Sequence, residues 1–200
     1  MVLFAPSLSA LEKLLKICED FVKSHNLLYN TTKSIVMVFK SKNEIIQTPS
    51  VLLDERKMNF NHSLKYLGNI ITDDLKDIED MERQRRAISV RTSMLSRRFY
   101  FCSPKVKIIL FNAFCTSLYT SELWVDYTTS QWHKLKVAYN NAYRQLFRLP
   151  RYCSATEMFL EGRVHTFRAL LRHRMGSLWR RLGQSKNAII TAMTAWLESP

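Results

Sequence analysis

Three short segments of the sequence hold the residue types that could do chemistry. Asn30-Thr31-Thr32-Lys33-Ser34 places a lysine in a polar turn immediately before the apolar run Ile35 to Phe39. The segment Ser63 to Ile71 contains Lys65-Tyr66-Leu67-Gly68, and the pair Asp73-Asp74 follows it. A lysine suits phosphate contact because phosphoryl transfer is catalysed largely by positioning and charge. Paired carboxylates suit a divalent cation.

Each segment also has an ordinary structural interpretation. Asn-Thr-Thr-Lys alone is typical of a plain turn with a solvated lysine, and Tyr66 with Leu67 would be core residues of an ordinary hairpin. Asp73-Asp74 precedes an acidic stretch that resembles a helix start. We therefore expect these two carboxylates to cap a helix and complement its dipole, and not to hold a metal.

Histidines and cysteines show no spacing that indicates a metal site or a catalytic triad. The five histidines form no known motif, and the four cysteines contain no Cys-x-x-Cys pair. We expect Cys18, Cys102, Cys115 and Cys153 to be buried free thiols in a reducing compartment. The sequence predicts no metal and no cofactor for this chain.

Charge is distributed unevenly along the chain, whose net charge is +13. Residues 1–82 contain 10 Lys+Arg and 12 Asp+Glu, whereas residues 83–200 contain 20 and 5. Such an excess indicates a polyanionic partner, because each neutralised phosphate releases counterions. The alternative is a merely basic domain. The arginines expected to contact nucleic acid are Arg83, Arg86, Arg91, Arg97, Arg98, Arg144, Arg148, Arg168 and Arg172.

Aromatic residues interleave with these arginines. Tyr100, Tyr139, Tyr143 and Tyr152 could stack on bases, although we expect most of them to pack in the core. No apolar run approaches the roughly 18 residues that a membrane span needs, so no membrane partner is expected.

The patterns predict an α+β fold that changes character near Met81. Before Met81, we expect one helix, capped by the box Ser9-Ala10-Leu11-Glu12, with an apolar stripe from Leu11 to Val22 that includes Phe21. Asp54 to Lys57 is expected to form a hairpin tip. The expected strands are Val2–Ala5, Leu27–Tyr29 paired with Ile35–Phe39, Val51–Leu53, Met58–Phe60 and Leu64–Ile71.

After Met81 the apolar residues recur with a helical period along almost the whole chain. Expected helix starts are Ser103-Pro104, Ser130, Ser154 and Thr166, with a terminal helix from Ala188 to Leu197. The helix after Ser103 is apolar on several sides, with Phe111 off its main stripe, which is typical of the centre of a bundle. In the helix after Ser130, one seam is expected to face the core. It contains Trp132, Leu135, Tyr139, Ala142, Leu146 and Leu149.

Together, the opening Met1 to Ser7, the Asn30 to Ser34 turn and the Ser63 to Ile71 segment resemble part of a known enzyme. They are similar to the end of the reverse transcriptase palm of jockey-like non-LTR retrotransposons. Pro150 to Ser154 and Val164 to Phe167 extend the resemblance more weakly. It implies an RNA-directed DNA polymerase, a nucleotidyltransferase that uses magnesium and deoxynucleotides to copy RNA.

The resemblance assigns roles to single residues. Lys33 would lie near the phosphates of the incoming nucleotide, and Asn30 would shape its turn. The primer-grip turn would comprise Lys65, Tyr66, Leu67 and Gly68. Residues 1–80 would be a partial palm, and residues 81–200 a basic helical thumb and C-terminal region. The expected partner is an RNA and DNA template-primer.

In this family the metal-binding aspartates belong to a Tyr-Ala-Asp-Asp box directly before the segment that matches Met1 to Ser7. The expectation is therefore a fragment that binds template-primer and does not polymerise by itself. The alternative is a non-enzymatic helical adaptor, derived from a mobile element, that binds nucleic acid or protein. A third interpretation is a decayed reading frame without a stable fold.

Overall fold

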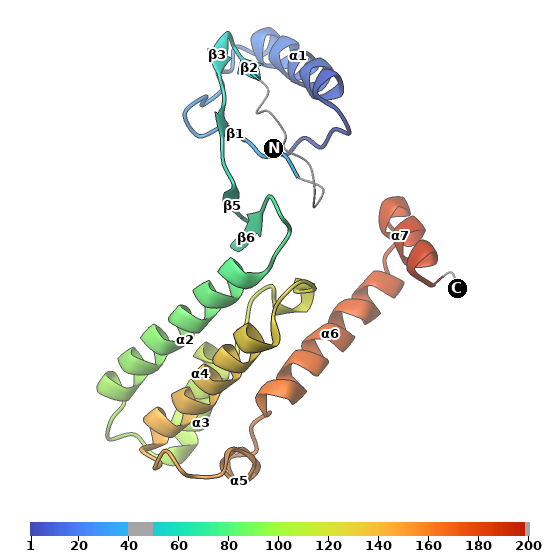
Figure 1. The fold of residues 1–200 in the computed structure, drawn as a ribbon. Helices are drawn as coiled ribbons and strands as arrows, with labels where there is room; N and C mark the ends of the chain where they lie inside the picture. The colour runs from blue at the N-terminus through green and yellow to red at the C-terminus, as the bar shows by residue number, and fades with distance from the viewer. Residues whose placement is uncertain (40–49, 199–200) are drawn as a thin grey trace. The chain divides into compact units, whose positions relative to one another are not determined.

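The structure, a computed structural model, describes residues 1–39 and 50–198 (Figure 1). The chain is mixed α+β and divides into two compact units. Unit 1 comprises Met1–Tyr66 and Ile70–Lys76, and unit 2 comprises Leu67–Asn69 and Asp77–Pro200. The described part of the chain contains no helix that is long and apolar enough to cross a membrane.

Unit 1 combines one helix, α1 (Leu8–Ser24), with very short strands. β1 (Ile35–Val36) pairs in parallel with β4 (Asn59–Phe60), and β2 (Leu52–Leu53) pairs in antiparallel fashion with β3 (Arg56–Lys57). β5 (Ser63–Tyr66) and β6 (Asn69–Thr72) form a third ladder.

A small aliphatic core holds unit 1 together. It consists of Leu15, Val36, Val51, Leu53 and Met58. The β2–β3 turn is Asp54-Glu55, and both residues have positive φ (50° and 61°), as a two-residue hairpin turn requires. The charged hairpin tip is thus confirmed, with Arg56 and Lys57 already in the second strand.

Four expectations for unit 1 were wrong. Val2–Ala5 and Leu27–Tyr29 are not strands, because a strand needs a partner for its backbone groups and β1 pairs with β4 instead. The cap of α1 is Ser7, whose extended backbone lets its Oγ accept from the Ala10 amide at 3.3 Å, and Ser9 lies inside the first turn. Phe21 is exposed, and its ring stacks on His25.

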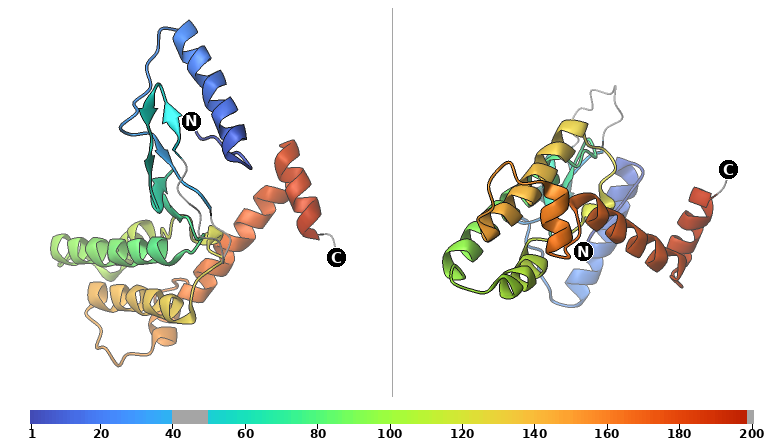
Figure 2. Two further views of the ribbon diagram at one scale, coloured as in Figure 1. Left: turned by 45° about the horizontal axis from the view of Figure 1, so that its top comes forward. Right: turned by 90° about the horizontal axis from the view of Figure 1, so that it is seen from below.

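Unit 2 is built from helices (Figures 1 and 2). The bounds are α2 Ile78–Arg98, α3 Pro104–Phe114, a 3-10 turn η1 Ser121–Leu123, α4 Thr129–Phe147, α5 Ala155–Glu161, α6 Phe167–Gly183 and α7 Ala188–Glu198. α2 packs along α4, and α3 and α6 also contact α4. The core centre is aromatic: the Phe111 ring lies 5.3 Å from Tyr139, 5.1 Å from Tyr143 and 6.4 Å from Phe159.

The helix starts in unit 2 follow local chemistry. Ser103-Pro104, Ser154 and Thr166 begin α3, α5 and α6 as expected, and Gly162 ends α5. Thr128, two residues before the expected Ser130, caps α4, because its Oγ1 accepts from the Gln131 amide at 3.2 Å.

Burial follows the expected seam of α4 but not that of α3. Leu135, Tyr139, Ala142 and Leu146 are buried. In α3 only Phe111 is buried, so α3 is not central to the bundle, and Val106, Ile109 and Phe114 are exposed.

Candidate nucleic-acid interface

In unit 1, the turn before β1 holds Lys33 on the surface. Asn30 organises this turn, since its side-chain Oδ1 accepts from the Lys33 amide at 3.1 Å and from the Thr32 hydroxyl at 2.7 Å. Its carbonyl oxygen accepts from the Lys33 and Ser34 amides. The Lys33 side chain is exposed, so its ammonium group is available to an anion.

The β5–β6 turn brings the residues of the expected primer grip onto one tight bend. Leu67 and Gly68 both have positive φ, 46° and 85°. The second value favours glycine. Lys65, Tyr66 and Leu67 are exposed. A Cβ atom on Gly68 would lie 3.1 Å from Tyr119 Cε1, so within unit 2 the absence of a side chain lets this turn approach the 119–121 segment closely.

Sequence reasoning missed the buried acid that organises this approach, Asp80 in α2. Its Oδ1 accepts from Arg83 Nε at 2.7 Å, and its Oδ2 accepts from Trp124 Nε1 at 2.9 Å. Thr120 Oγ1 lies 3.1 Å from Asp80 Oδ2 and 3.4 Å from Oδ1 of Asn69, the first residue of β6.

A second polar side chain of α2 supports the same segment, because Gln84 Nε2 donates to the Tyr119 carbonyl at 2.6 Å. Asp80 and Gln84 therefore position the segment against which Gly68 lies. The available signal was spacing, since Asp80, Gln84 and Ile88 recur every four residues along one buried face.

The pair Asp73-Asp74 does not cap a helix, contrary to expectation. α2 begins at Ile78 with Asp77 at its cap position. Asp74 closes a turn instead: its carboxylate accepts from the Thr72 hydroxyl and the Lys76 amide and lies 2.7 Å from Lys76 Nζ. The hydrogen bonds from Lys76 and Thr72 lower the pKa of Asp74 to about 2. Asp73 Oδ2 lies 2.7 Å from His62 Nδ1.

Asp77 has a different structural role. Its carboxylate accepts from the Val125 and Asp126 amides, and burial raises its pKa. Within residues 1–39 and 50–198, no group of three or more His, Cys, Asp or Glu side chains is placed to hold a metal ion.

Some of the arginines that were expected to bind nucleic acid instead make hydrogen bonds or ion pairs within unit 2. Arg83 pairs with the buried Asp80. Arg91 donates to the Phe114 carbonyl and to Ser117 Oγ at 2.9 Å, and Arg144 donates to the Cys153 carbonyl at 2.8 Å. These guanidinium groups stabilise the fold and are less free to meet a phosphate. Arg86 is intermediate: it contacts Glu82 at 3.1 Å, yet its side chain is 74% exposed.

The other expected arginines stay on the surface. Arg97, Arg98, Arg168 and Arg172 are exposed and have no hydrogen-bond or ion-pair partner among the described residues. Arg97 also lines a shallow hollow along the outer face of α2, together with Ser89, Val90, Ser93 and Met94.

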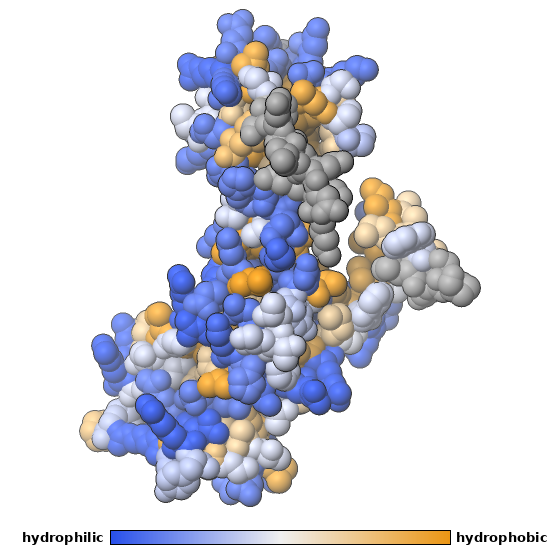
Figure 3. Space-filling view, in the orientation of Figure 1, coloured by the Kyte–Doolittle hydropathy of each residue, from blue (hydrophilic) through white to orange (hydrophobic). Residues whose placement is uncertain are grey.

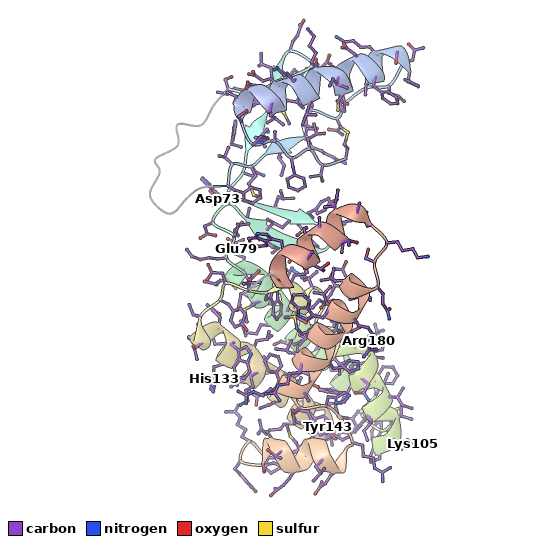
Figure 4. The ribbon with its side chains drawn as sticks, turned by 90° about the vertical axis from the view of Figure 1, so that its right-hand side faces the viewer. Asp73, Glu79, Lys105, His133, Tyr143 and Arg180 are labelled. Atoms are coloured by element: carbon purple, nitrogen blue, oxygen red, sulfur yellow. The ribbon has the colours of Figure 1, made fainter. Side chains whose placement is uncertain are left out.

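Unit 2 carries further exposed cations besides the arginines named above. Lys105, at the start of α3, and Arg180, in α6, are labelled in Figure 4. Arg151 and Arg163 are also exposed. Hydrophilic residues cover much of the visible face of the helices in Figure 3.

Two of the four tyrosines considered for base stacking are unavailable. Tyr139 and Tyr143 are buried, and burial raises the pKa of both phenols. Tyr139 donates to the His165 carbonyl at 2.8 Å. Tyr100 and Tyr152 remain exposed, and the guanidinium carbon of Arg148 lies 3.2 Å from the centre of the Tyr100 ring.

All four cysteines are free, but only Cys115 is buried, and burial raises its pKa. Cys18, Cys102 and Cys153 are half-buried, so the expectation of four buried thiols was wrong for three of them. Cys153 packs against the edge of the unit 2 core and is therefore only partly covered.

No family model, curated protein or solved structure matches this chain. The relationship to retrotransposon reverse transcriptases therefore stays a prediction that rests on the segments named above, and the function must be argued from the side chains themselves.

Proposed function

We propose that this chain supplies the end of the palm and the thumb of a non-LTR retrotransposon reverse transcriptase, and that it binds an RNA and DNA template-primer. The basic helices of unit 2 hold the duplex backbone. The turn Lys65 to Gly68 contacts the primer strand. Lys33 contacts the phosphates of the incoming nucleotide when the complete enzyme is assembled.

The observation that carries this proposal is the set of exposed arginines without a protein partner among the described residues. Arg97 and Arg98 end α2, and Arg168 and Arg172 follow one another by one helical turn on α6. Guanidinium groups suit phosphate because they present several donors in a planar fork. Cations that take no part in the fold remain free to exchange their counterions for phosphates.

The surface of α2 also supports close approach of a duplex. Ser89 and Ser93 are small, and with Val90, Met94 and Arg97 they line the shallow hollow on the outer face of that helix. Arg86 follows the same exposed face and is only partly neutralised by Glu82. A nucleic-acid backbone can lie along such a face with little steric hindrance.

The β5–β6 turn has the geometry that a strand-gripping element needs. Gly68 removes a side chain from the tightest point of the bend, and Lys65 and Tyr66 are exposed beside it. Buried polar contacts from Asp80 and Gln84 support the segment beneath the turn. We propose no metal or other cofactor for this chain, and assign magnesium to the complete enzyme.

A salt titration tests the binding. The affinity of the purified chain for an RNA–DNA hybrid is measured by fluorescence anisotropy at several salt concentrations. Each neutralised phosphate contributes about −0.9 to the slope of log affinity against log salt. We expect a slope of about −4 or steeper, because at least four exposed arginines would meet phosphates. An affinity that barely changes with salt contradicts the proposal.

Primer extension tests the expectation that this chain does not polymerise by itself. Two-metal transfer needs carboxylates that converge from several segments, and the resemblance places none of the family's metal-binding aspartates on residues of this chain. We expect binding without extension when magnesium and deoxynucleotides are added. Extension above background shows that the assignment is wrong.

The rival is a protein-binding adaptor. One observation favours it: α7 exposes Ile189, Met193 and Trp196. Absence of nucleic-acid binding even at low salt would support this rival and refute the thumb assignment.

A further inference from the structure

Two loops of unit 2 meet where α2 and α4 end. One loop joins α2 to α3 and contains Tyr100 and Phe101, and the other joins α4 to α5 and contains Arg148 and Tyr152. Figures 1 and 2 both show these loops at the same end of the bundle. The Arg148 guanidinium over the Tyr100 ring connects them directly, at 3.2 Å from guanidinium carbon to ring centre.

These loops expose aromatic rings that would ordinarily be buried. Phe101 is 95% exposed, and Tyr152 is 90% exposed. Phe101 lies edge-on to Tyr100, with ring centres 4.7 Å apart. Exposed apolar surface that clusters on one site indicates a binding surface more often than scattered single residues do.

Hydrogen bonds hold both loops, one of them from Arg144 of α4 and the others within the loops. Arg144 donates to the Cys153 carbonyl, and the Cys153 amide donates to the Pro150 carbonyl. The Cys102 amide donates to the Phe99 carbonyl. Arg148 itself has a left-handed backbone (φ 58°) that ends α4 and directs the chain into the loop. The exposed rings therefore stand on a fixed framework.

The surroundings are strongly positive. Arg97, Arg98 and Arg151 are exposed at the ends of the same helices and loops, and Lys105 begins α3 beyond Phe101. Between Arg83 and Ser154, the sequence contains only two carboxylates, Glu122 and Asp126. Stacking surfaces within a basic surface match unpaired nucleotides, because every base has a flat face and every nucleotide carries a phosphate.

We propose that Tyr100, Phe101, Arg148 and Tyr152 form a stacking platform for the unpaired bases of a single-stranded nucleic acid. This inference rests on the proposed function for the class of partner and adds a second element to it. A duplex hides its base faces and meets only the arginines. A single strand can also stack on Phe101, on Tyr152 and on the outer plane of the Arg148 guanidinium group.

Tyr152 follows Arg148 by four residues and therefore lies within about 14 Å of it. That span suits a few successive nucleotides. Tyr100 supports Arg148 from beneath, as a positioning residue that leaves the outer guanidinium plane available.

The test compares one single strand with one duplex. The full chain is titrated, at one low salt concentration, with a labelled 16-nucleotide uridylate strand and with an RNA–DNA hybrid of 16 base pairs. The variant Phe101→Ala/Tyr152→Ala removes two exposed rings without disturbing the core. Phe4→Ala, which removes a ring 80% exposed in unit 1, is the matched control. We expect the double variant to lose at least about 5-fold in single-strand affinity per ring, with duplex affinity unchanged within about twofold and no effect of Phe4→Ala.

A second pair of variants separates stacking from charge. Arg148→Lys keeps the positive charge and removes the planar group, whereas Arg56→Lys makes the same change at an exposed arginine of unit 1. We expect Arg148→Lys to weaken single-strand binding severalfold at an unchanged salt slope, and Arg56→Lys to leave single-strand binding near the wild-type value.

Every outcome decides between the proposals. Unchanged single-strand affinity in the double variant, or an equal loss for strand and duplex, overturns the platform. Wild-type binding to the duplex alone overturns the platform and leaves the duplex-binding proposal standing. Wild-type binding to the single strand alone, with loss in the variant, supports the platform and overturns duplex binding. Binding to neither overturns both.

Discussion

The two units of this chain are held together by different kinds of contact. Unit 2 has an aromatic centre in which Phe111, Tyr139, Tyr143 and Phe159 contact one another, and buried polar groups such as Asp80 and Gln84 are hydrogen-bonded within it. Unit 1 has an aliphatic core of Leu15, Val36, Val51, Leu53 and Met58, and its strands β1, β2, β3 and β4 are each only two residues long. The stability of unit 1 therefore depends on few contacts.

The two units also differ in net charge. Unit 1 contains 10 Lys+Arg and 8 Asp+Glu, whereas unit 2 contains 20 and 9. The unit with the larger core thus also carries nearly all of the positive excess. A large core can hold a repulsive surface in place, and a surface of this kind is what a nucleic-acid backbone requires.

Breaking the buried polar centre of unit 2 should have the largest effect. Asp80→Ala leaves Arg83, Trp124 and Thr120 without their shared acceptor. Loss of one partner of a buried pair costs about 3–5 kcal/mol. Urea unfolding monitored by tryptophan fluorescence measures the loss of stability in unit 2 alone, since all four tryptophans (Trp124, Trp132, Trp179 and Trp196) belong to it.

The control for Asp80→Ala is Glu82→Gln, which weakens a half-exposed ion pair with Arg85 on the same helix. We expect that change to cost less than about 1 kcal/mol. Equal effects of the two substitutions would show that Asp80 does not have the central role that its contacts indicate.

Truncation in the core of unit 1 should destabilise unit 1 without changing the stability of unit 2. Leu53→Ala removes a fully packed side chain and should cost unit 1 about 2–5 kcal/mol. Hydrogen exchange of residues 51–60 should accelerate, while the tryptophan transition of unit 2 keeps its midpoint. A matching shift of that midpoint would mean that the units unfold together.

The β5–β6 turn offers a smaller and more local test. Gly68→Ala places a Cβ at φ 85° and 3.1 Å from Tyr119, and we expect a cost of about 1–2 kcal/mol. Gly176→Ala, in the middle of α6 with open space around it, should instead stabilise by about 0.5–1 kcal/mol. Urea midpoints of the two variants should therefore move in opposite directions.

Acid should reveal the smallest effect. Hydrogen bonds from Arg85 lower the pKa of Glu82 from 4.5 to about 2. A lowered carboxyl pKa contributes stability that is present above about pH 4.5 and is lost as the pH falls toward 2. The stability difference between wild type and Glu82→Gln should shrink over that interval.

Local capping signals predicted most helix starts, because a cap involves residues only two or three apart. Ser103-Pro104, Ser154 and Thr166 were read correctly. The errors at Ser9 and Ser130 are of two residues each. They arise because Ser7 and Thr128 are equally good caps with an extended backbone.

Contacts between segments far apart in the sequence could not be predicted from local patterns. The parallel pairing of β1 with β4 joins residues 24 positions apart, and the inward position of Phe111 depends on Tyr139 and Phe159. Asp80 looked like one of several acidic residues before a helix, and its burial is set by Trp124 and Thr120, more than 39 residues away. The same tertiary contacts decided which arginines are free, which composition alone could not show.

The most direct test of the account is the salt dependence of duplex binding in a charge variant of unit 2. The variant Arg97→Ala/Arg98→Ala/Arg168→Ala/Arg172→Ala removes four exposed cations that lack a protein partner among the described residues. The slope of log affinity against log salt should flatten by about 3 to 4, while the urea midpoint of unit 2 stays near that of wild type. An unchanged slope in the folded variant would contradict the claim that these arginines bind the nucleic-acid backbone.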